Sequence, residues 1–206
     1  MTAPIEHIRA LLARHDAAVV GALASRALCG RAPDGFYARL GERFLGAVAA
    51  PAEETAPFRE RIVTGYVAQV VPLLAPPAAG APGAVDALRA ADAAALDAIS
   101  ARLGLSLQVA ACKLEGRDAR LRAAATAGDQ TALEALITYP SVEQLVLLRV
   151  RSRASEYVRT HNVAPALASR LPDALNTVYA AWLIPLSRAI QAAWLVTAVR
   201  RERAAP

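Results

Sequence analysis

A single lysine, Lys113, stands in a chain of 206 residues whose other 22 basic side chains are all arginines. A position that keeps lysine favours a compact ammonium on a flexible stem over a planar guanidinium fork. Arg102 lies eleven residues earlier, which in a helix places it only about 20° from Lys113 around the axis. The residues between them on that face, Ser106 and Val109, are not typical of a solvated surface. Two cations on one inward face predict a bound anion. The alternative for Lys113 is that a bias in composition toward arginine left this one lysine by chance.

Other familiar arrangements of reactive side chains do not occur in this sequence. Cys29 and Cys112 are far apart and match no metal or redox spacing. The three histidines include no pair at ligand spacing beside a carboxylate, so we expect no metal site. No P-loop, GxSxG or GxGxxG motif is present. We therefore expect a site that works without a metal or a cofactor.

Composition and charge restrict the class of protein further. The chain is 55% hydrophobic and 5% aromatic, and its formal net charge is +5 with the arginines spread along its length. It lacks the basic stripe with interleaved aromatic residues that would indicate nucleic-acid binding, whereas a small polyanionic ligand suits this charge. The apolar run 17–24 lies inside a helical pattern and is not expected to be a signal peptide. The segment 178–199 contains Pro185 and Arg188, which indicates a buried helix and no membrane span. We expect a cytoplasmic protein with reduced thiols.

Helices are the only elements that the sequence pattern predicts, so the expected fold class is all-α. Alanine, leucine and arginine favour helix, and no alternating run predicts a strand. Asp129 suits the N-cap of one helix, and Pro140 suits the first position of the next. Pro185 should kink the long C-terminal helix, because it removes a backbone donor and crowds the preceding turn. We expect a single domain over 1–206 with a flexible linker at about 75–84. The predicted helices are 5–28, 36–48, 58–74, 85–114, 117–127, 129–137, 140–157 and 172–203.

Four of these helices carry polar residues that the apolar periodicity places toward the core. They are Arg9 on the first helix, Arg102 and Lys113 on the long central one, Glu143 after Pro140, and Ser187 with Gln191 on the last. Each has a structural alternative. Arg9 can be a surface arginine paired with Asp16 two turns away. Glu143 can serve only the helix dipole, and Gln191 can be a satisfied amide between packed helices.

Several segments, taken in order, resemble one known family. They are 92–102 with 109–113, then 129–138 with 141–143, Arg149 and 154–157, then 178–187 with Gln191, preceded by Ile8-Arg9, Asp16, 25–26 and 66–74. Together they resemble the all-helical chorismate mutases of the yeast and plant type, over most of the chain. The resemblance implies a helical bundle with long C-terminal helices. It also implies the Claisen rearrangement of chorismate to prephenate, in the shikimate route to phenylalanine and tyrosine or in a specialised pathway.

The resemblance assigns a role to each matching polar residue. Arg9 and Arg102 would hold the two carboxylates of the substrate, with Ser187 assisting one of them. Lys113 would contact a carboxylate and the ether oxygen of the breaking C–O bond. Glu143 would receive the ring hydroxyl of the substrate.

Two further positions carry detail specific to this chain. Gln191 stands where the yeast enzyme has a glutamate and the short bacterial enzymes have a glutamine. An amide donates its hydrogen bond at any pH, so we expect activity nearly flat between about pH 5 and 8, where Glu143 stays ionised. Tyr139 replaces the Asn or Asp that the family usually places near the ring hydroxyl. It is still expected at the substrate, where its backbone could take part or its ring could narrow the pocket.

The chain is shorter than the yeast enzyme around 30–57 and 75–90. In the relatives those segments help to build the site for aromatic amino-acid effectors, so the resemblance implies that such regulation is absent or altered here. The relatives are dimers, and by that analogy alone we expect a homodimer.

The reaction implied by the resemblance suits these residue types. A pericyclic rearrangement needs no nucleophile, no acid–base relay and no cofactor. The enzyme must hold a flexible dianion in its reactive shape and stabilise the negative charge that grows on the ether oxygen. Two other functions fit parts of the pattern. One is an isochorismate pyruvate-lyase on the same fold, although such proteins are typically much shorter. The other is a non-catalytic helical bundle that binds a partner or regulates it.

Overall fold

The structure is a computed structural model that describes residues 5–37, 57–74, 84–116 and 118–204. Within those ranges every regular element is a helix, so the predicted all-α class is confirmed. The elements are α1 (Ile5–Leu28), α3 (Arg59–Gly65), η2 (Tyr66–Val70), α4 (Val71–Leu74), α5 (Val85–Glu115), α6 (Ala119–Ala127), α7 (Gln130–Ile137), α8 (Pro140–Thr160), α9 (Pro165–Ala168), α10 (Leu171–Val178), η3 (Tyr179–Leu183) and α11 (Ile184–Ala204).

The helix boundaries follow local sequence signals closely. The bounds predicted for α1 are confirmed, and α5 runs one residue beyond its predicted end. Asp129 caps α7 as predicted, because its Oδ1 accepts a hydrogen bond from the backbone nitrogen of Ala132 at 3.0 Å. Pro140 opens α8, which continues to Thr160. Most of the helix expected at 36–48, and nearly all of the expected linker, lie outside the described residues.

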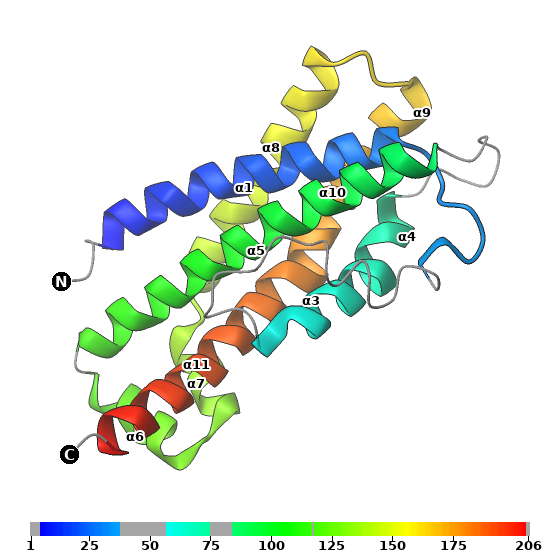
Figure 1. The fold of residues 1–206 in the computed structure, drawn as a ribbon. Helices are drawn as coiled ribbons and strands as arrows, with labels where there is room; N and C mark the ends of the chain where they lie inside the picture. The colour runs from blue at the N-terminus through cyan, green and yellow to red at the C-terminus, as the bar shows by residue number, and fades with distance from the viewer. Residues whose placement is uncertain (1–4, 38–56, 75–83, 117, 205–206) are drawn as a thin grey trace.

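Four long helical rods form the bundle (Figure 1). They are α1, α5, α8 and the continuous run of α10, η3 and α11. Helices α1 and α5 lie side by side and run in opposite directions, and α8 and α11 pack against them. The short helices α6 and α7 pack on α11 at the end of the molecule that holds the C-terminus. The inner faces of α1, α5, α8 and α11 therefore look toward one another.

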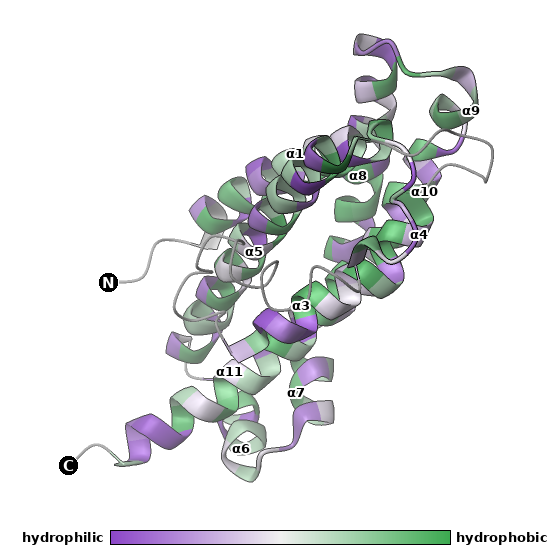
Figure 2. Ribbon diagram, turned by 45° about the vertical axis from the view of Figure 1, so that its right-hand side comes forward, coloured by the Kyte–Doolittle hydropathy of each residue, from purple (hydrophilic) through white to green (hydrophobic). Residues whose placement is uncertain are grey.

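Apolar side chains hold the rods together, and residues of high hydropathy recur along each rod (Figure 2). Leu23 of α1, Leu96 and Leu103 of α5, and Ile190 of α11 have no exposed surface and belong to one core cluster. Burying a side chain of this size contributes about 1.5–3 kcal/mol. A second, smaller cluster joins α6 and α7 to the ends of α5 and α11. Polar side chains that share these inner faces are thus carried on rigid, closely packed helices.

Two prolines inside helices each follow a π-helical turn. Pro72 comes after η2 and Pro185 after η3. The nitrogen of Val71 bonds to the carbonyl of Tyr66, and that of Ile184 bonds to the carbonyl of Tyr179, five residues back in both cases. A proline lacks the N–H and crowds the carbonyl four residues earlier, and the wider turn relieves that crowding. The disturbance predicted at Pro185 therefore takes the form of a π turn.

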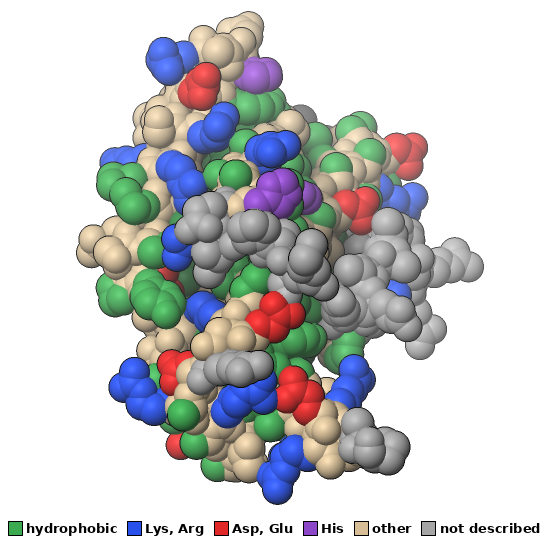
Figure 3. All heavy atoms as spheres, turned by 90° about the vertical axis from the view of Figure 1, so that its left-hand side faces the viewer, with side chains coloured by type: hydrophobic (Ala, Val, Ile, Leu, Met, Phe, Trp, Pro, Cys, Tyr) green, Lys and Arg blue, Asp and Glu red, His purple; other side chains and the backbone are tan. Residues whose placement is uncertain are grey.

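Two helical runs deserve comparison with membrane spans. Val85–Glu115 and Leu171–Ala204 are long and apolar enough to cross a membrane by length and composition, but 61% of the most apolar window of each is buried inside the bundle. Such burial is typical of core helices, the interpretation already given to 178–199. On the face shown in Figure 3, basic side chains lie among acidic and hydrophobic ones.

Candidate active site

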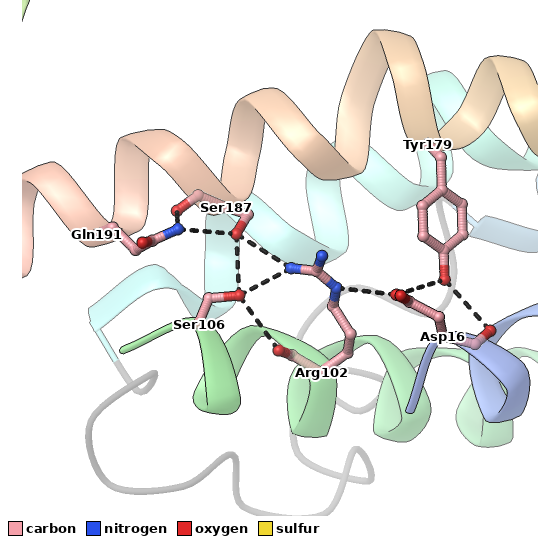
Figure 4. A network of polar contacts seen from close by, with 6 residues as sticks. All are labelled: Asp16, Arg102, Ser106, Tyr179, Ser187 and Gln191. Atoms are coloured by element: carbon pink, nitrogen blue, oxygen red, sulfur yellow. Dashed lines mark hydrogen bonds and ion pairs between the residues drawn. The ribbon is translucent and has the colours of Figure 1, made fainter. Parts of the chain in front are cut away.

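Arg102 lies at the centre of a buried hydrogen-bond network that joins three helical rods (Figure 4). Its Nε donates to Oδ1 of Asp16, from α1, at 3.2 Å. Its Nη1 donates to Oγ of Ser106 at 2.7 Å and to Oγ of Ser187 at 3.1 Å. Ser106 lies one turn further along α5, whereas Ser187 belongs to α11. The guanidinium is therefore fixed by side chains from α1, α5 and α11 together.

Asp16 is also held by the C-terminal run. Tyr179, the first residue of η3, donates its hydroxyl toward Oδ1 of Asp16 at 3.2 Å and toward the Asp16 carbonyl at 3.3 Å. One sequence interpretation paired Asp16 with Arg9, and the structure corrects it. Asp16 points into the core with 4% of its surface exposed and forms its ion pair with Arg102, while Arg9 lies exposed. The sequence analysis did not assign Asp16 or Tyr179 to the site.

Ser187 and Gln191, predicted one turn apart on the last helix, extend the same network. Ser187 Oγ donates to Ser106 Oγ at 2.9 Å. The Nε2 of Gln191 donates to both the Oγ and the backbone carbonyl of Ser187, each at 3.2 Å. Three of the predicted site residues, Arg102, Ser187 and Gln191, are thereby in one continuous chain of hydrogen bonds.

Some polar atoms of this network remain unengaged. Within the described residues, Asp16 Oδ2 and Gln191 Oε1 are buried without a hydrogen-bond partner. The second terminal nitrogen of Arg102, Nη2, makes no hydrogen bond in the described part of the chain either. Leaving a buried polar group unpaired is unfavourable by about 1–3 kcal/mol. Such groups are typical of a site where a ligand completes the bonding, and a guanidinium edge suits a carboxylate.

Lys113 lies further along α5 in a partly buried position. Its Nζ donates to the carbonyl of Ile137, the last residue of α7, at 2.9 Å, and lies 4.7 Å from the centre of the Tyr139 ring. Burial, and next the Arg9 guanidinium, lower the pKa of Lys113 to about 8. The exposed Arg9 therefore lies close enough for its charge to act on Lys113, as expected if both face one anion.

Glu143 meets a cation that the sequence analysis did not place in the site. Its Oε1 lies 3.8 Å from Nε of Arg188, the residue after Ser187 on α11. Nη1 of Arg188 donates to Oγ1 of Thr138 at 3.4 Å. The sequence could have indicated this residue, because Arg188 lies between the two predicted site residues Ser187 and Gln191.

The seven predicted site residues thus fall into local groups. Arg102, Ser187 and Gln191 form one, Lys113 lies against Tyr139 with Arg9 nearby, and Glu143 pairs with Arg188. Eleven helical residues separate Arg102 from Lys113, which corresponds to about 16 Å along the axis. A ligand that contacts both side chains would therefore have to lie between them along this helix face.

Within the described residues, the polar network is distinct from any metal site and from the cavity at the ends of α5 and α11. The described residues contain no group of three or more His, Cys, Asp or Glu side chains that could hold a metal ion. A cavity of about 690 Å³ lies at the ends of α5 and α11, lined by residues such as Phe58, Leu114, Trp194 and Arg201. It opens on a different face of α5 from Lys113, so it is separate from the polar network.

Fold and site together define a class: an all-α bundle whose inner faces carry a fixed guanidinium, an ammonium and neutral hydrogen-bond donors. Solved structures identify the fold. Aro7p chorismate mutase from Candida albicans, in complex with L-Trp, has a TM-score of 0.73 at 19% identity, covering 94% of this chain and 90% of that one. The chloroplast chorismate mutase from Zea mays has a TM-score of 0.71 at 19% identity, over 94% and 95%. The chain therefore has the fold of the all-helical chorismate mutases, which confirms at the level of fold the resemblance seen in its sequence.

Sequence comparison also finds a similar chorismate mutase, over a shorter region of the chain. No family model matches the chain. Chorismate mutase 2 from Arabidopsis thaliana is 30% identical over 145 residues, which are 64% of this chain and 51% of that protein. The match thus spans about half the length of that curated relative.

Proposed function

We propose that this protein is a chorismate mutase that converts chorismate to prephenate. The observation that carries the proposal is the state of Arg102. A buried guanidinium is fixed by three helices and keeps one terminal nitrogen unengaged, inside the fold of the chorismate mutases. The similarity to Chorismate mutase 2 supports the same activity.

In the proposed mechanism the protein binds and orients a dianion and does no covalent chemistry. Arg102, through Nη2, and Arg9 bind the two carboxylates and hold the substrate in its compact reactive shape. Lys113 lies where an ammonium can bind a carboxylate and stabilise the charge that develops on the ether oxygen. A million-fold acceleration requires about 8 kcal/mol of transition-state stabilisation. Orientation of a flexible substrate alone can supply much of that amount.

The neutral donors and the carboxylate complete this assignment. Gln191 donates to the ether oxygen after its amide turns away from Ser187, which it contacts in the present arrangement. Ser187 supports the bound carboxylate beside Arg102. Glu143 accepts the ring hydroxyl, and its ion pair with Arg188 keeps the carboxylate at that end of the site.

The pKa of Lys113 narrows the pH range over which the activity is expected to be constant. The catalytic form of this residue is the ammonium, and its pKa is lowered to about 8. The rate constant kcat/KM reports the ionisation of the free enzyme. It should therefore stay flat from about pH 5 to 7 and fall to half near pH 8, instead of staying flat up to pH 8.

The direct test is the disappearance of chorismate absorbance with purified protein, run beside Lys113→Ala and Arg89→Ala. Turnover to prephenate should fall at least about a hundredfold in Lys113→Ala, because an ammonium at the ether oxygen is lost. Arg89 lies exposed on the same helix and pairs only with the exposed Asp86, so Arg89→Ala should keep the wild-type rate.

Absence of turnover in the wild type would contradict the proposal. Isochorismate would then be the next substrate, to test for a pyruvate-lyase. A non-catalytic bundle would also gain no thermal stability from a dianionic transition-state analogue, whereas an intact site must gain it.

We also propose that the enzyme acts in the cytoplasm as a homodimer. An exposed apolar row on α8 offers a surface for association, because Val142, Leu145 and Leu148 are 40%, 59% and 65% exposed. Cell fractionation and light scattering on the purified chain check these two points.

AtCM1 has structures with tyrosine and with phenylalanine in an allosteric site. For this chain we propose that such regulation is absent or altered, and calorimetry with the three aromatic amino acids tests it.

A further inference from the structure

The ammonium of Lys113 is held by two groups of different kinds. One is the carbonyl of Ile137 at the C-terminal end of α7, where the helix dipole is negative. The other is the face of the Tyr139 ring, whose centre is 4.7 Å from Nζ. An ammonium has three hydrogen donors. The carbonyl and the ring face direct two of them, which leaves the third for a ligand.

Tyr139 occupies a position where other residue types would serve the helix better. It is the N-cap of α8, where Ser, Thr, Asp and Asn are preferred because their side chains accept hydrogen bonds from the first turn. The Tyr139 side chain makes no such bond, and only its backbone carbonyl accepts from Val142 and Glu143, at 2.9 and 3.1 Å. Pro140 restricts Tyr139 to an extended backbone, observed at φ −126° and ψ 94°. The local structure therefore fixes the backbone from which the ring extends toward Lys113.

The hydroxyl of Tyr139 has no comparable role in the protein. It makes no hydrogen bond within the described residues, and the side chain is 52% exposed. The interaction that Tyr139 makes inside the site is thus the contact between its ring face and the ammonium.

We propose that Tyr139 is a positioning residue whose ring face holds the ammonium of Lys113 in place for the substrate, so that Tyr139 acts through Lys113. This inference rests on the proposed function. It gives Tyr139 a role other than the two expected from the sequence, in which its backbone takes part at the substrate or its ring narrows the pocket.

The surrounding charges explain why the ammonium needs this support. Burial, and next the Arg9 guanidinium on α1, disfavour the charged form of Lys113 and lower its pKa. At the start of α8, Glu143 is paired with Arg188 of α11. The ring of Tyr139 and the carbonyl of Ile137 therefore act against Arg9 and burial. Because the pKa of Lys113 is about 8, losing either support should reduce the charged fraction at neutral to mildly alkaline pH.

The decisive experiment uses the fact that the chain has one lysine. Protein labelled with [ε-13C]lysine, without a lysine in any tag, gives a single side-chain resonance, and its titration reports the pKa of Lys113. Tyr139→Phe keeps a ring face and lacks the hydroxyl, whereas Tyr139→Leu keeps apolar bulk and lacks the ring face. Gln144→Ala, at an exposed position of the same helix, serves as a control for local change.

We expect wild type, Tyr139→Phe and Gln144→Ala to titrate together, with the pKa of Lys113 lower by about 0.4–0.7 pH unit in Tyr139→Leu. The same Leu variant should lose about two- to fivefold in kcat/KM at pH 6, and more at pH 8, with Tyr139→Phe losing less at both. Equal titration of the Leu and Phe variants would overturn the inference. So would an equal loss of kcat/KM in both, because the hydroxyl would then be the active part. If the wild type does not turn over chorismate, the proposed function fails, while the titration still tests the ring against the ammonium.

Discussion

Two buried clusters in this bundle are built from the same three residue types. In one, Arg26 pairs with Asp92, which also accepts a hydrogen bond from Tyr66 at 2.6 Å. In the other, Arg102 pairs with Asp16, which accepts from Tyr179 at 3.2 Å. Each tyrosine is the first residue of a π turn, η2 or η3. The two clusters therefore share composition and local context.

They differ in whether their hydrogen bonds are complete. Nη1 of Arg26 donates to the Gly30 carbonyl at 2.9 Å and Nη2 donates to the hydroxyl of Tyr37 at 2.8 Å. Tyr37 in turn donates to Oδ2 of Asp92 at 2.9 Å. Burial alone would lower the pKa of Arg26, but Asp92 and then Tyr37 raise it above its usual value. The Arg26 cluster is closed and stabilises the fold.

The Arg102 cluster is open. Among the described residues, Nη2 of Arg102 makes no hydrogen bond, and Oδ2 of Asp16 is buried without a partner. The difference teaches that burial of an arginine does not by itself mark a binding site. Unused hydrogen-bonding groups are the better indication of such a site, because an anionic ligand can bond to them.

The largest difference between the two clusters is expected when Arg26→Gln is compared with Arg102→Gln. Arg26→Gln leaves Asp92 as an unpaired buried carboxylate and should lower the free energy of unfolding by about 3–5 kcal/mol. The folded fraction should keep its kcat/KM. Arg102→Gln should lower kcat/KM at least about a hundredfold and the free energy of unfolding by only about 1–3 kcal/mol. Urea unfolding and chorismate kinetics measure both quantities, and equal losses of activity in the two variants would remove the distinction.

A smaller contrast is expected from the carboxylates. Asp92→Asn should lower the free energy of unfolding by about 3 kcal/mol, because Arg26 then loses the carboxylate with which it forms its ion pair. Asp16→Asn should instead lower kcat/KM about tenfold, mainly through KM, because Arg102 is less firmly oriented toward a carboxylate. A stability loss for Asp16→Asn as large as that for Asp92→Asn, with KM unchanged, would show that both clusters are purely structural.

The smallest difference between the two clusters is expected from their tyrosines, in the stability of the protein at alkaline pH. Burial, and next Asp92, raise the pKa of Tyr66 well above its usual value, and burial with Asp16 does the same for Tyr179. Because the pKa is higher in the folded state, the stability contributed by each hydroxyl is present below about pH 10 and is lost as pH rises above it. Tyr66→Phe should cost about 1–2 kcal/mol at pH 7 and Tyr179→Phe about 1 kcal/mol or less.

Urea unfolding at pH 7 and above pH 10 checks this prediction. Each Phe variant should lose less stability than the wild type over that interval, because one titrating group is removed. An unchanged pH dependence in both variants would contradict the assignment of the two hydroxyls.

Much of the fold followed from local signals in the sequence. The bounds of α1, the Asp129 cap and the opening of α8 at Pro140 depend on neighbours within a few residues, and all were predicted. The π turns were not, because a proline signals a disturbed helix without saying how the backbone absorbs it. The positions of Ser187 and Gln191 beside Arg102 matched the helical spacing of the last helix and the resemblance to a known family.

The sequence by itself determined that the chain forms helices and that Arg102 and Lys113 share one helix face, because propensity and periodicity act over short distances along the chain. Only the tertiary structure decided that Asp16 pairs with Arg102. It also decided that the hydrogen bonds of the Arg26 cluster are complete and those of the Arg102 cluster are not. The partners of those arginines lie 86 and 66 residues away. Periodicity cannot choose between distant partners, and only the packing of α1 against α5 brings each carboxylate to its guanidinium.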